Sequence, residues 1–354
     1  MNRLQSYITS IKYIKNLISF KRQHPNVTAE NQFYKGLNGS DVPMNVFSPK
    51  GKQKNIIFII FPGASPKGEN HEGMVTLGSI LACIGYKCLI PRIPPLKDLD
   101  LLDNNSDWFS HAYKEITNRK DISDYKIAVI GMSFGGAILV KSLASGMCNG
   151  KKAKSALLYG APYDNKTFIN FLLTGEISID GEIQKVKQHE WGIIVILHNF
   201  LNKINLGYDT SLMEKILKNK IAENESYVSE NIKKLNPEQK EIIESAFNGI
   251  ASKSIKKICT QIKNECNDLI DQISPKYFCK NVKEHTFIAH GANDTMVPYT
   301  ESLLLSKNMT NNELFISYLY EHKEISSDKG IIFKIKEIFK MMNYFSKYFY
   351  YNEN

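Results

Sequence analysis

The strongest constraint on the fold of this chain is the stretch KIAVIGMSFGGAILVKSL, residues 126–143. Its first five residues, KIAVI, are typical of a strand buried on both faces of a parallel sheet. The residues after Gly136 form an apolar helical segment, and Ser133 stands between Gly131 and Gly135 at the junction. Glycine permits backbone turns that other residues resist. The stretch therefore predicts a strand that turns sharply at Ser133 into a helix.

The rest of the chain alternates between predicted strands and helices. An antiparallel hairpin is expected around the turn-rich segment 37–42. The continuous apolar run at residues 55–61 again indicates a strand buried on both faces. Further strands are predicted at 87–93, 126–130, 155–160, 285–291 and 313–320, with helices at 74–84, 108–118 and 301–305. This order predicts a doubly wound, mostly parallel α/β sheet.

The length of 354 residues exceeds that of one compact domain, so we expect an insertion or a second domain. Between residues 165 and 280 the pattern is helical only. We therefore predict an amphipathic helical segment at 1–30, a core of 31–164 and 281–354, and a helical cap inserted at 165–280. An insertion that leaves and rejoins the sheet here should lie over the strand ends, where open α/β sheets bind ligands.

Composition excludes several classes of protein. The 43% hydrophobic and 23% charged residues fit an ordinary globular protein. The net charge of +9 comes from scattered lysines, so no nucleic-acid partner is predicted. The six cysteines lack CxxC spacing, which argues against a zinc site or a disulfide framework and favours a reducing, cytoplasmic location. No apolar stretch is long enough for a transmembrane helix.

The amino-terminal segment has a helical apolar stripe accompanied by basic residues. Two interpretations stay open: the stripe packs on its own domain, or this helix touches a membrane surface, with the protein peripheral to the membrane. The stripe consists of Leu4, Ile8, Ile11, Ile14 and Ile18, and the basic residues are Arg3, Lys12, Lys15, Lys21 and Arg22. The aromatic-rich segment 330–350 is expected to be a closing core helix.

The segment GMSFGG resembles the nucleophile elbow, GxSxG, of the α/β-hydrolase superfamily, with Gly131, Ser133 and Gly135 at the fixed positions. In such a turn a side chain two residues before or after the serine would collide with neighbouring backbone. The alternative is that Ser133 only caps the following helix. The resemblance implies the α/β-hydrolase fold and makes Ser133 the nucleophile of an acyl transfer.

The family order of catalytic residues is serine, acid, histidine. The segment HGANDTMVP resembles the acid turn of these hydrolases and makes Asp294 the acid. His322 follows the last predicted strand, 28 residues later, and is the expected base. Asp164 is the alternative acid, and His290 is expected to be structural. His189 and His198 lie in the insertion, where core or surface roles are expected.

The oxyanion hole should use the backbone N–H groups of Phe134, the residue after the nucleophile, and Ala64, in the loop FPGAS. Many relatives have histidine where Pro62 stands, and a plain Pro-Gly turn is the alternative there. No metal or cofactor is required by this chemistry.

The predicted function is hydrolysis of a small-molecule ester or thioester with a hydrophobic acyl group. Apolar stretches of the insertion at 167–173 and 191–201 could line an acyl pocket or pack onto the sheet. A serine peptidase of the prolyl-oligopeptidase kind and a non-catalytic binding protein are the alternatives. The sequence carries no signal for an oligomeric state.

Overall fold

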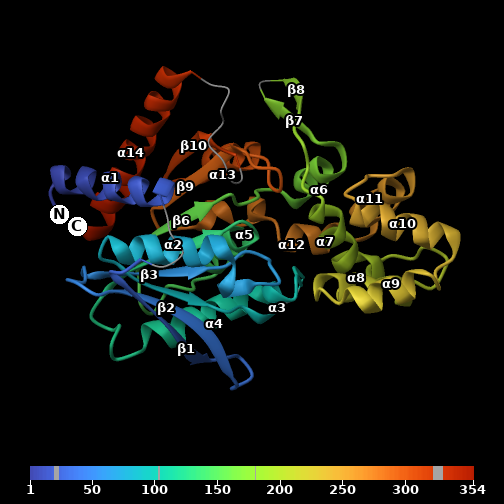
Figure 1. Ribbon diagram of the computed structural model, residues 1–354, viewed down its shortest axis with the longest axis horizontal. Helices are drawn as coiled ribbons and strands as arrows, with labels where there is room; N and C mark the ends of the chain where they lie inside the picture. Colours follow the sequence, from blue (N-terminus) through green and yellow to red (C-terminus); the bar gives the residue numbers. More distant parts are fainter. Residues whose placement is uncertain (20–23, 103, 180, 322–329) are drawn as a thin grey trace.

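The computed structural model describes residues 1–19, 24–102, 104–179, 181–321 and 330–354. Its centre is an eight-stranded sheet in the order β1-β2-β4-β3-β5-β6-β9-β10 (Figure 1). The strands are β1 (Val27–Lys35), β2 (Asp41–Pro49), β3 (Ile56–Phe61), β4 (Lys87–Pro91), β5 (Lys126–Met132), β6 (Ala153–Tyr159), β9 (Thr286–Asn293) and β10 (Asn312–Glu321). From β4 to β10 all neighbours are parallel, so the predicted doubly wound sheet is confirmed.

The predicted hairpin is β1 and β2, which pair antiparallel from Val27 opposite Pro49 to Lys35 opposite Asp41. Strand β2 then pairs antiparallel with β4, which attaches the hairpin to the edge of the sheet. The first helix, α1, ends at Ser19, and β1 already begins at Val27. The predicted segment 1–30 therefore includes the start of the sheet.

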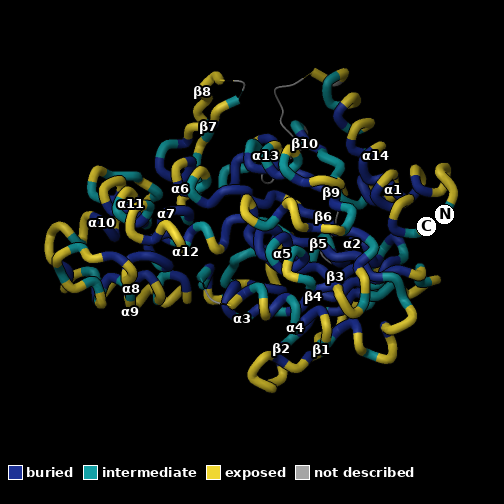
Figure 2. The backbone as a smooth tube through the Cα atoms, turned by 180° about the vertical axis from the view of Figure 1, so that it is seen from behind, coloured by how far each residue is buried: buried dark blue, intermediate teal, exposed yellow. Residues whose placement is uncertain are grey.

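Alternate residues of the buried strands face opposite sides of the sheet, as the pleat requires. In β3, Ile57 and Ile59 belong to one core, whereas Phe58 and Ile60 belong to the other. Helices α4 and α5 cover the first face, and α1, α2 and α14 cover the second (Figures 1 and 2). The helices of this part are α1 (Arg3–Ser19), α2 (Glu72–Cys83), α3 (Pro94–Lys97), α4 (Asn105–Thr117), α5 (Phe134–Ala144), α13 (Thr300–Asn308) and α14 (Ile331–Glu353), with a 3₁₀ turn, η1 (Gly68–Asn70).

The segment between β6 and β9 has a hydrophobic core built largely from its own residues and lies beside the sheet (Figure 1). Its elements are α6 (Asn165–Thr174), β7 (Glu176–Ile179), β8 (Glu182–Lys185), α7 (Trp191–Phe200), η2 (Leu201–Lys203), α8 (Ser211–Ile221), α9 (Glu225–Ile232), α10 (Pro237–Phe247), α11 (Lys253–Glu265), α12 (Asn267–Gln272), η3 (Pro275–Tyr277) and η4 (Cys279–Asn281). The expectation of helices only was wrong at β7 and β8, which form a two-stranded antiparallel sheet. Gly175, with φ of 67°, ends α6 in the left-handed conformation before β7 begins.

The amino-terminal helix packs on α14, but not through its whole apolar stripe. The face of α1 toward the protein carries Ser6, Thr9, Ser10, Tyr13 and Ile14. The stripe residues Leu4, Ile8, Ile11 and Ile18 are exposed.

Hydroxyl and aromatic contacts hold α1 in place. The Ser6 and Ser346 hydroxyls are 2.8 Å apart, and the Tyr13 ring centroid is 4.6 Å from that of Phe345. The buried face of α1 therefore combines hydroxyl and aromatic contacts with one residue of the predicted stripe, Ile14.

The two ends of the chain lie side by side (Figure 1). The amino group of Met1 donates to Asn354 Oδ1 at 2.9 Å, and Asn354 Nδ2 donates to the Met1 carbonyl at 3.1 Å.

Candidate active site

Ser133 occupies a one-residue turn between β5, which ends at Met132, and α5, which begins at Phe134. Its backbone has φ of 51° and ψ of −129°, a region that residues with a Cβ rarely adopt. The Ser133 N–H donates to the Tyr159 carbonyl at 2.7 Å, and the Gly136 N–H donates to the Ser133 carbonyl at 2.8 Å. Such strain persists only where its surroundings enforce it, and it is concentrated at functional sites.

The glycines around Ser133 are required by close backbone approach. A Cβ at position 131 would lie 2.7 Å from the Cα of Gly136. A Cβ at position 135 would overlap the Pro62 carbonyl oxygen and lie 2.8 Å from its carbonyl carbon. Both distances are shorter than carbon contacts tolerate. The pattern of glycine, serine and glycine is therefore a packing requirement of this turn.

The loop after β3 lies directly against the turn. A Cβ at Gly63 would lie 2.9 Å from the Met132 carbonyl oxygen and 3.1 Å from the Ser133 Cβ. The next residue, Ala64, lines the same cavities as Ser133. Neither the Ala64 nor the Phe134 N–H donates a hydrogen bond to another described residue. Phe134 is the first residue of α5, where N–H groups lack helical partners and the helix dipole favours negative charge.

Asp294 follows the carboxyl end of β9. Its Oδ1 accepts hydrogen bonds from the N–H groups of Met296 at 2.8 Å and Val297 at 3.0 Å. Two backbone donors fix the carboxylate in its turn and stabilise its charged form. The Cβ that a side chain would add at Gly160, after β6, would lie 3.4 Å from Asp294 Oδ2. Asp294 thus lies at the same edge of the sheet as Ser133, with β6 between their strands.

His290 is buried and both of its ring nitrogens have partners. Its Nε2 donates to the Val297 carbonyl at 2.9 Å, and its Nδ1 lies 2.7 Å from the Ser302 hydroxyl. Because the carbonyl can only accept, Nε2 carries a proton and Nδ1 accepts from the serine in the neutral ring. This arrangement gives His290 a structural role beside Asp294, whose Oδ2 is 3.6 Å from Nε2.

His322, the predicted base, lies outside the described residues. The last described position before it, Glu321, is the ladder partner of Asn293 in the pairing of β10 with β9. The chain positions that immediately precede His322 and Asp294 are therefore side by side.

Asp164, the alternative acid, is engaged elsewhere. Its Oδ1 caps α6 by accepting from the Lys166 N–H at 2.9 Å, and its Oδ2 is 3.0 Å from Lys276 Nζ. The hydrogen bond and charge of Asp164 raise the pKa of Lys276. Asp164 lines neither of the cavities that contain Ser133.

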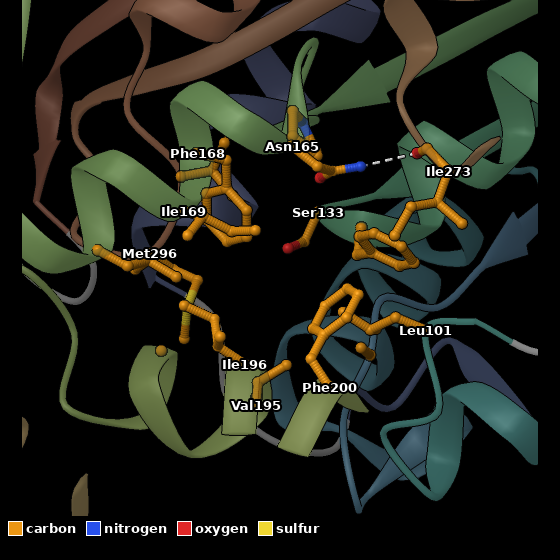
Figure 3. A pocket seen from close by; sticks show the side chains of 16 residues that line it. Leu101, Ser133, Asn165, Phe168, Ile169, Val195, Ile196, Phe200, Ile273 and Met296 are labelled. Carbon is orange, nitrogen blue, oxygen red and sulfur yellow. Dashed lines mark hydrogen bonds between the residues drawn. The ribbon is translucent and has the colours of Figure 1, made fainter. Parts of the chain in front are cut away.

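Ser133 lies between two cavities. The smaller, about 70 Å³, is lined by apolar side chains apart from Ser133 and Asn165, and includes Leu101, Phe168, Ile169, Val195, Ile196, Phe200, Ile273 and Met296 (Figure 3). Figure 3 shows the Ser133 side chain among residues of α6 and α7. The larger cavity, about 520 Å³, is more polar, and Asp294, His71 and His189 line it.

The wall of the smaller cavity was predicted in part. The apolar stretches at 167–173 and 191–201 do contribute to it. Leu101, Ile273 and Met296 were missed, because each lies in a loop or at a helix end where no periodicity marks it. Met296 could have been considered, since it follows the predicted acid turn.

The described residues contain no group of three or more His, Cys, Asp or Glu side chains that could hold a metal ion.

The comparisons with known proteins identify a fold. No family model and no curated protein matches the sequence. Among solved structures, acylaminoacyl peptidase from Pyrococcus horikoshii matches with a TM-score of 0.52 over 94% of this chain, at 13% identity. The protein has the α/β-hydrolase fold. The match covers 43% of the peptidase chain, so this chain spans less than half of the length of that protein.

Two further solved structures match over most of their length. Acetyl xylan esterase from Paenibacillus sp. R4 has a TM-score of 0.46, with 10% identity, 95% of this chain covered and 93% of the esterase. An esterase from Pyrococcus furiosus has a TM-score of 0.46, with 12% identity and coverage of 90% and 91%. Within the hydrolase fold, Ser133 and Asp294 both follow the carboxyl ends of parallel strands, where such sheets bind ligands.

Proposed function

We propose that this protein is a serine hydrolase that cleaves a carboxylic ester or thioester with a compact hydrophobic acyl group. The observation that carries the proposal is the strained turn at Ser133, which opens into an apolar cavity beside two backbone N–H groups that have no acceptor among the described residues. A helix cap needs none of these features, because capping residues adopt ordinary extended backbone. A nucleophile uses each of them, because the turn exposes the hydroxyl, the N–H groups can stabilise an oxyanion and the cavity can hold an acyl group.

In the proposed reaction, His322 accepts the Ser133 hydroxyl proton while Oγ bonds to the acyl carbon. The carbonyl oxygen becomes negative, and the N–H groups of Ala64 and Phe134 stabilise it. The imidazolium then gives its proton to the departing alcohol or thiol. Water, deprotonated by the same ring, attacks the acyl-enzyme and releases the acid. Asp294 holds the second ring nitrogen and stabilises the imidazolium.

The assignment of Asp294 and His322 is supported by backbone register. Asn293 of β9 and Glu321 of β10 are paired in the sheet. The predicted acid, Asp294, and the predicted base, His322, are the next residues in the sequence after these two. The hydrogen bonds from Met296 and Val297 also hold the Asp294 carboxylate in one orientation.

The two cavities suggest how the substrate is divided. The smaller, apolar cavity is suited to the acyl group, because it offers hydrophobic contact and few hydrogen-bonding partners. The larger cavity, with His71 and His189 in its wall, is suited to the alcohol or thiol part and to water. The small volume on the acyl side favours short or compact acids.

Peptide hydrolysis is the second candidate. The likeness to acylaminoacyl peptidase favours it, and the larger cavity could accommodate a peptide leaving group. The matched part is under half of that peptidase, so its substrate class does not transfer with the fold. Parallel assays with acyl esters and with acylated aminoacyl amides distinguish the two.

A fluorophosphonate probe tests whether Ser133 is nucleophilic. Wild-type protein should be labelled, and Ser133→Ala should not. The matched control is Ser145→Ala, an exposed serine at the other end of α5, which should label like wild type. Absence of labelling in folded wild-type protein would refute the enzymatic proposal and favour a binding protein.

A series of nitrophenyl esters and acyl thioesters of increasing chain length tests the substrate class. Turnover should be highest for short acyl chains and decline as the chain outgrows the smaller cavity. Negligible turnover of every ester and thioester, with intact probe labelling, would exclude ester and thioester hydrolysis and leave peptide hydrolysis as the proposed activity.

A further inference from the structure

The surface formed by α1 and the first half of α14 carries apolar side chains that no described element covers. On α1, Leu4 is 70% exposed, and Tyr7, Ile8, Ile11 and Ile18 are exposed with it. On α14, Ile332 is 69% and Phe339 57% exposed, with Ile335 between them. The spacings of three, four and seven residues put each set on one side of its helix.

These two stripes are adjacent. The α14 stripe of Ile332, Ile335 and Phe339 continues along the same side of the helix to Asn343. The Tyr7 hydroxyl of α1 donates to Asn343 Oδ1 at 2.8 Å. Helix α1 therefore crosses α14 where the α14 stripe ends, and the stripes of both helices meet at Tyr7. We call this surface the α1–α14 face; the crossing of the two helices is visible in Figure 1.

Basic side chains surround the face. Arg3, Lys12 and Lys15 are exposed on α1, which has no acidic residue, and Lys336 is exposed on α14. In the described part of the chain, none of these four pairs with an acidic side chain. The two acidic residues of α14 already have basic partners. Glu337 is buried and forms a salt bridge with Lys340, and Glu353 forms one with Lys54.

The combination of exposed apolar stripe and unpaired cations identifies the chemistry of the partner. We propose that the α1–α14 face docks on lipid membranes rich in anionic headgroups. The aliphatic and aromatic side chains would enter the boundary between headgroups and acyl chains, and the cations would contact lipid phosphate and carboxylate groups. Within the described residues, no helix combines the length and apolar character needed to cross a bilayer, so the contact would be interfacial.

A second copy of the chain fits this surface less well. In a two-fold symmetric dimer the same patch meets itself, so Lys12 and Lys15 of one copy would lie near those of the other. Like charges brought together without acidic partners oppose such an interface. A bilayer with negative headgroups has the complementary charge. The proposal does not depend on the catalytic role of Ser133.

Co-sedimentation of the full chain with lipid vesicles tests the proposal. Vesicles of phosphatidylcholine containing about one third phosphatidylserine should carry the protein down, and pure phosphatidylcholine vesicles should do so several-fold less. Raising the salt concentration should weaken the binding, because exposed charges are screened.

Variants at exposed positions separate the apolar contribution from folding. The double variant Ile8→Ser with Ile335→Ser should bind vesicles at least about tenfold more weakly. The reason is that two apolar side chains are no longer transferred from water into the membrane interface. The matched control is Ile183→Ser with Ile250→Ser, two isoleucines away from this face that are more exposed than Ile8 and Ile335. The control should bind like wild type.

A second pair of variants tests the position of the charges, since both variants lose two positive charges and have the same net charge. Lys12→Gln with Lys15→Gln should lose most binding to anionic vesicles, whereas Lys256→Gln with Lys257→Gln, exposed on α11, should retain it. Failure of wild-type protein to sediment, or equal losses in both pairs, would overturn the proposal. So would a dimer that the variants at Ile8 and Ile335 dissociate while vesicle binding stays unchanged.

Discussion

Replacing Gly135 by alanine should separate the turn at Ser133 from the loop at Pro62. The added Cβ would overlap the Pro62 carbonyl oxygen and lie 2.8 Å from the carbonyl carbon. Carbon atoms in contact prefer separations of about 3.5 to 4.0 Å. The loop and the turn would therefore have to move apart by roughly 1 Å.

Two opposing effects act on stability. Alanine stabilises a helix by up to about 1 kcal/mol more than glycine does, and position 135 is the second residue of α5. Overpacking against rigid backbone costs about 1–3 kcal/mol. The clash should prevail, so the free energy of unfolding should fall by about 1–2 kcal/mol. Because a displacement of about 1 Å in a catalytic group can cost about 100-fold in rate, ester turnover should fall by about two orders of magnitude.

Two quantities are measured for the variant and for the wild type. One is the free energy of unfolding in urea, monitored by tryptophan fluorescence, and the other is the hydrolysis rate of a short nitrophenyl ester. Gly150→Ala is the control, since a Cβ at Gly150 has no atom within 4 Å. Its stability and turnover should match wild type. If Gly135→Ala also matched wild type in both measurements, the close packing of the turn on the loop would not control the site.

Three further predictions concern the site and its support. Asp294→Asn should lower kcat by about four orders of magnitude by mispositioning the imidazole, whereas Asp164→Asn should retain most turnover; the reverse result would exchange the two assignments. Ile196→Ala, which enlarges the smaller cavity, should shift the preferred ester toward longer acyl chains, and an unchanged preference would place the acyl group elsewhere. Burial raises the pKa of Glu301 above its usual 4.5, so the wild-type protein should lose stability as pH rises above that value, because the unfolded chain ionises first. Glu301→Gln cannot titrate and should gain stability relative to wild type over the same interval; a difference independent of pH in urea unfolding would contradict this.

The sheet could be predicted because its buried strands have a clear sequence signal. Residues 56–61 and 127–130 are continuous apolar runs with glycine or proline directly after them, and few other structures accommodate such runs. The β7–β8 hairpin was missed because its strands are short and largely exposed. Ile183 is 70% exposed, so no burial pattern accompanies the turn.

The buried face of α1 was not predictable from hydrophobicity. The periodicity of its isoleucines shows a stripe, but the partner decides which side is covered. Here α14 presents Ser346 and Phe345, which suit Ser6 and Tyr13 better than they suit Leu4 or Ile8. A local pattern contains no information about a helix more than 300 residues away.

The sharp turn at Ser133 was predictable from the sequence, but the surroundings of the candidate site were not. The turn at Ser133 follows from glycines that tight backbone contact requires. The separation of Ser133 from Asp294 depends on β6 lying between β5 and β9, which only the strand order reveals. The cavity wall joins Leu101 after α3 to Phe200 of α7 and Ile273 after α12, three segments brought together only by folding.

The adjacent ends of the chain have a practical consequence. Met1 and Asn354 exchange hydrogen bonds, so a short flexible linker could join them without displacing α1 or α14. A chain closed in this way could be reopened at Gly181, in the turn between β7 and β8, and would keep every strand pairing of the central sheet. Such a circular permutant would present new termini away from Met1 and Asn354, leaving the region where the two ends meet free of tags and tethers (Figure 1).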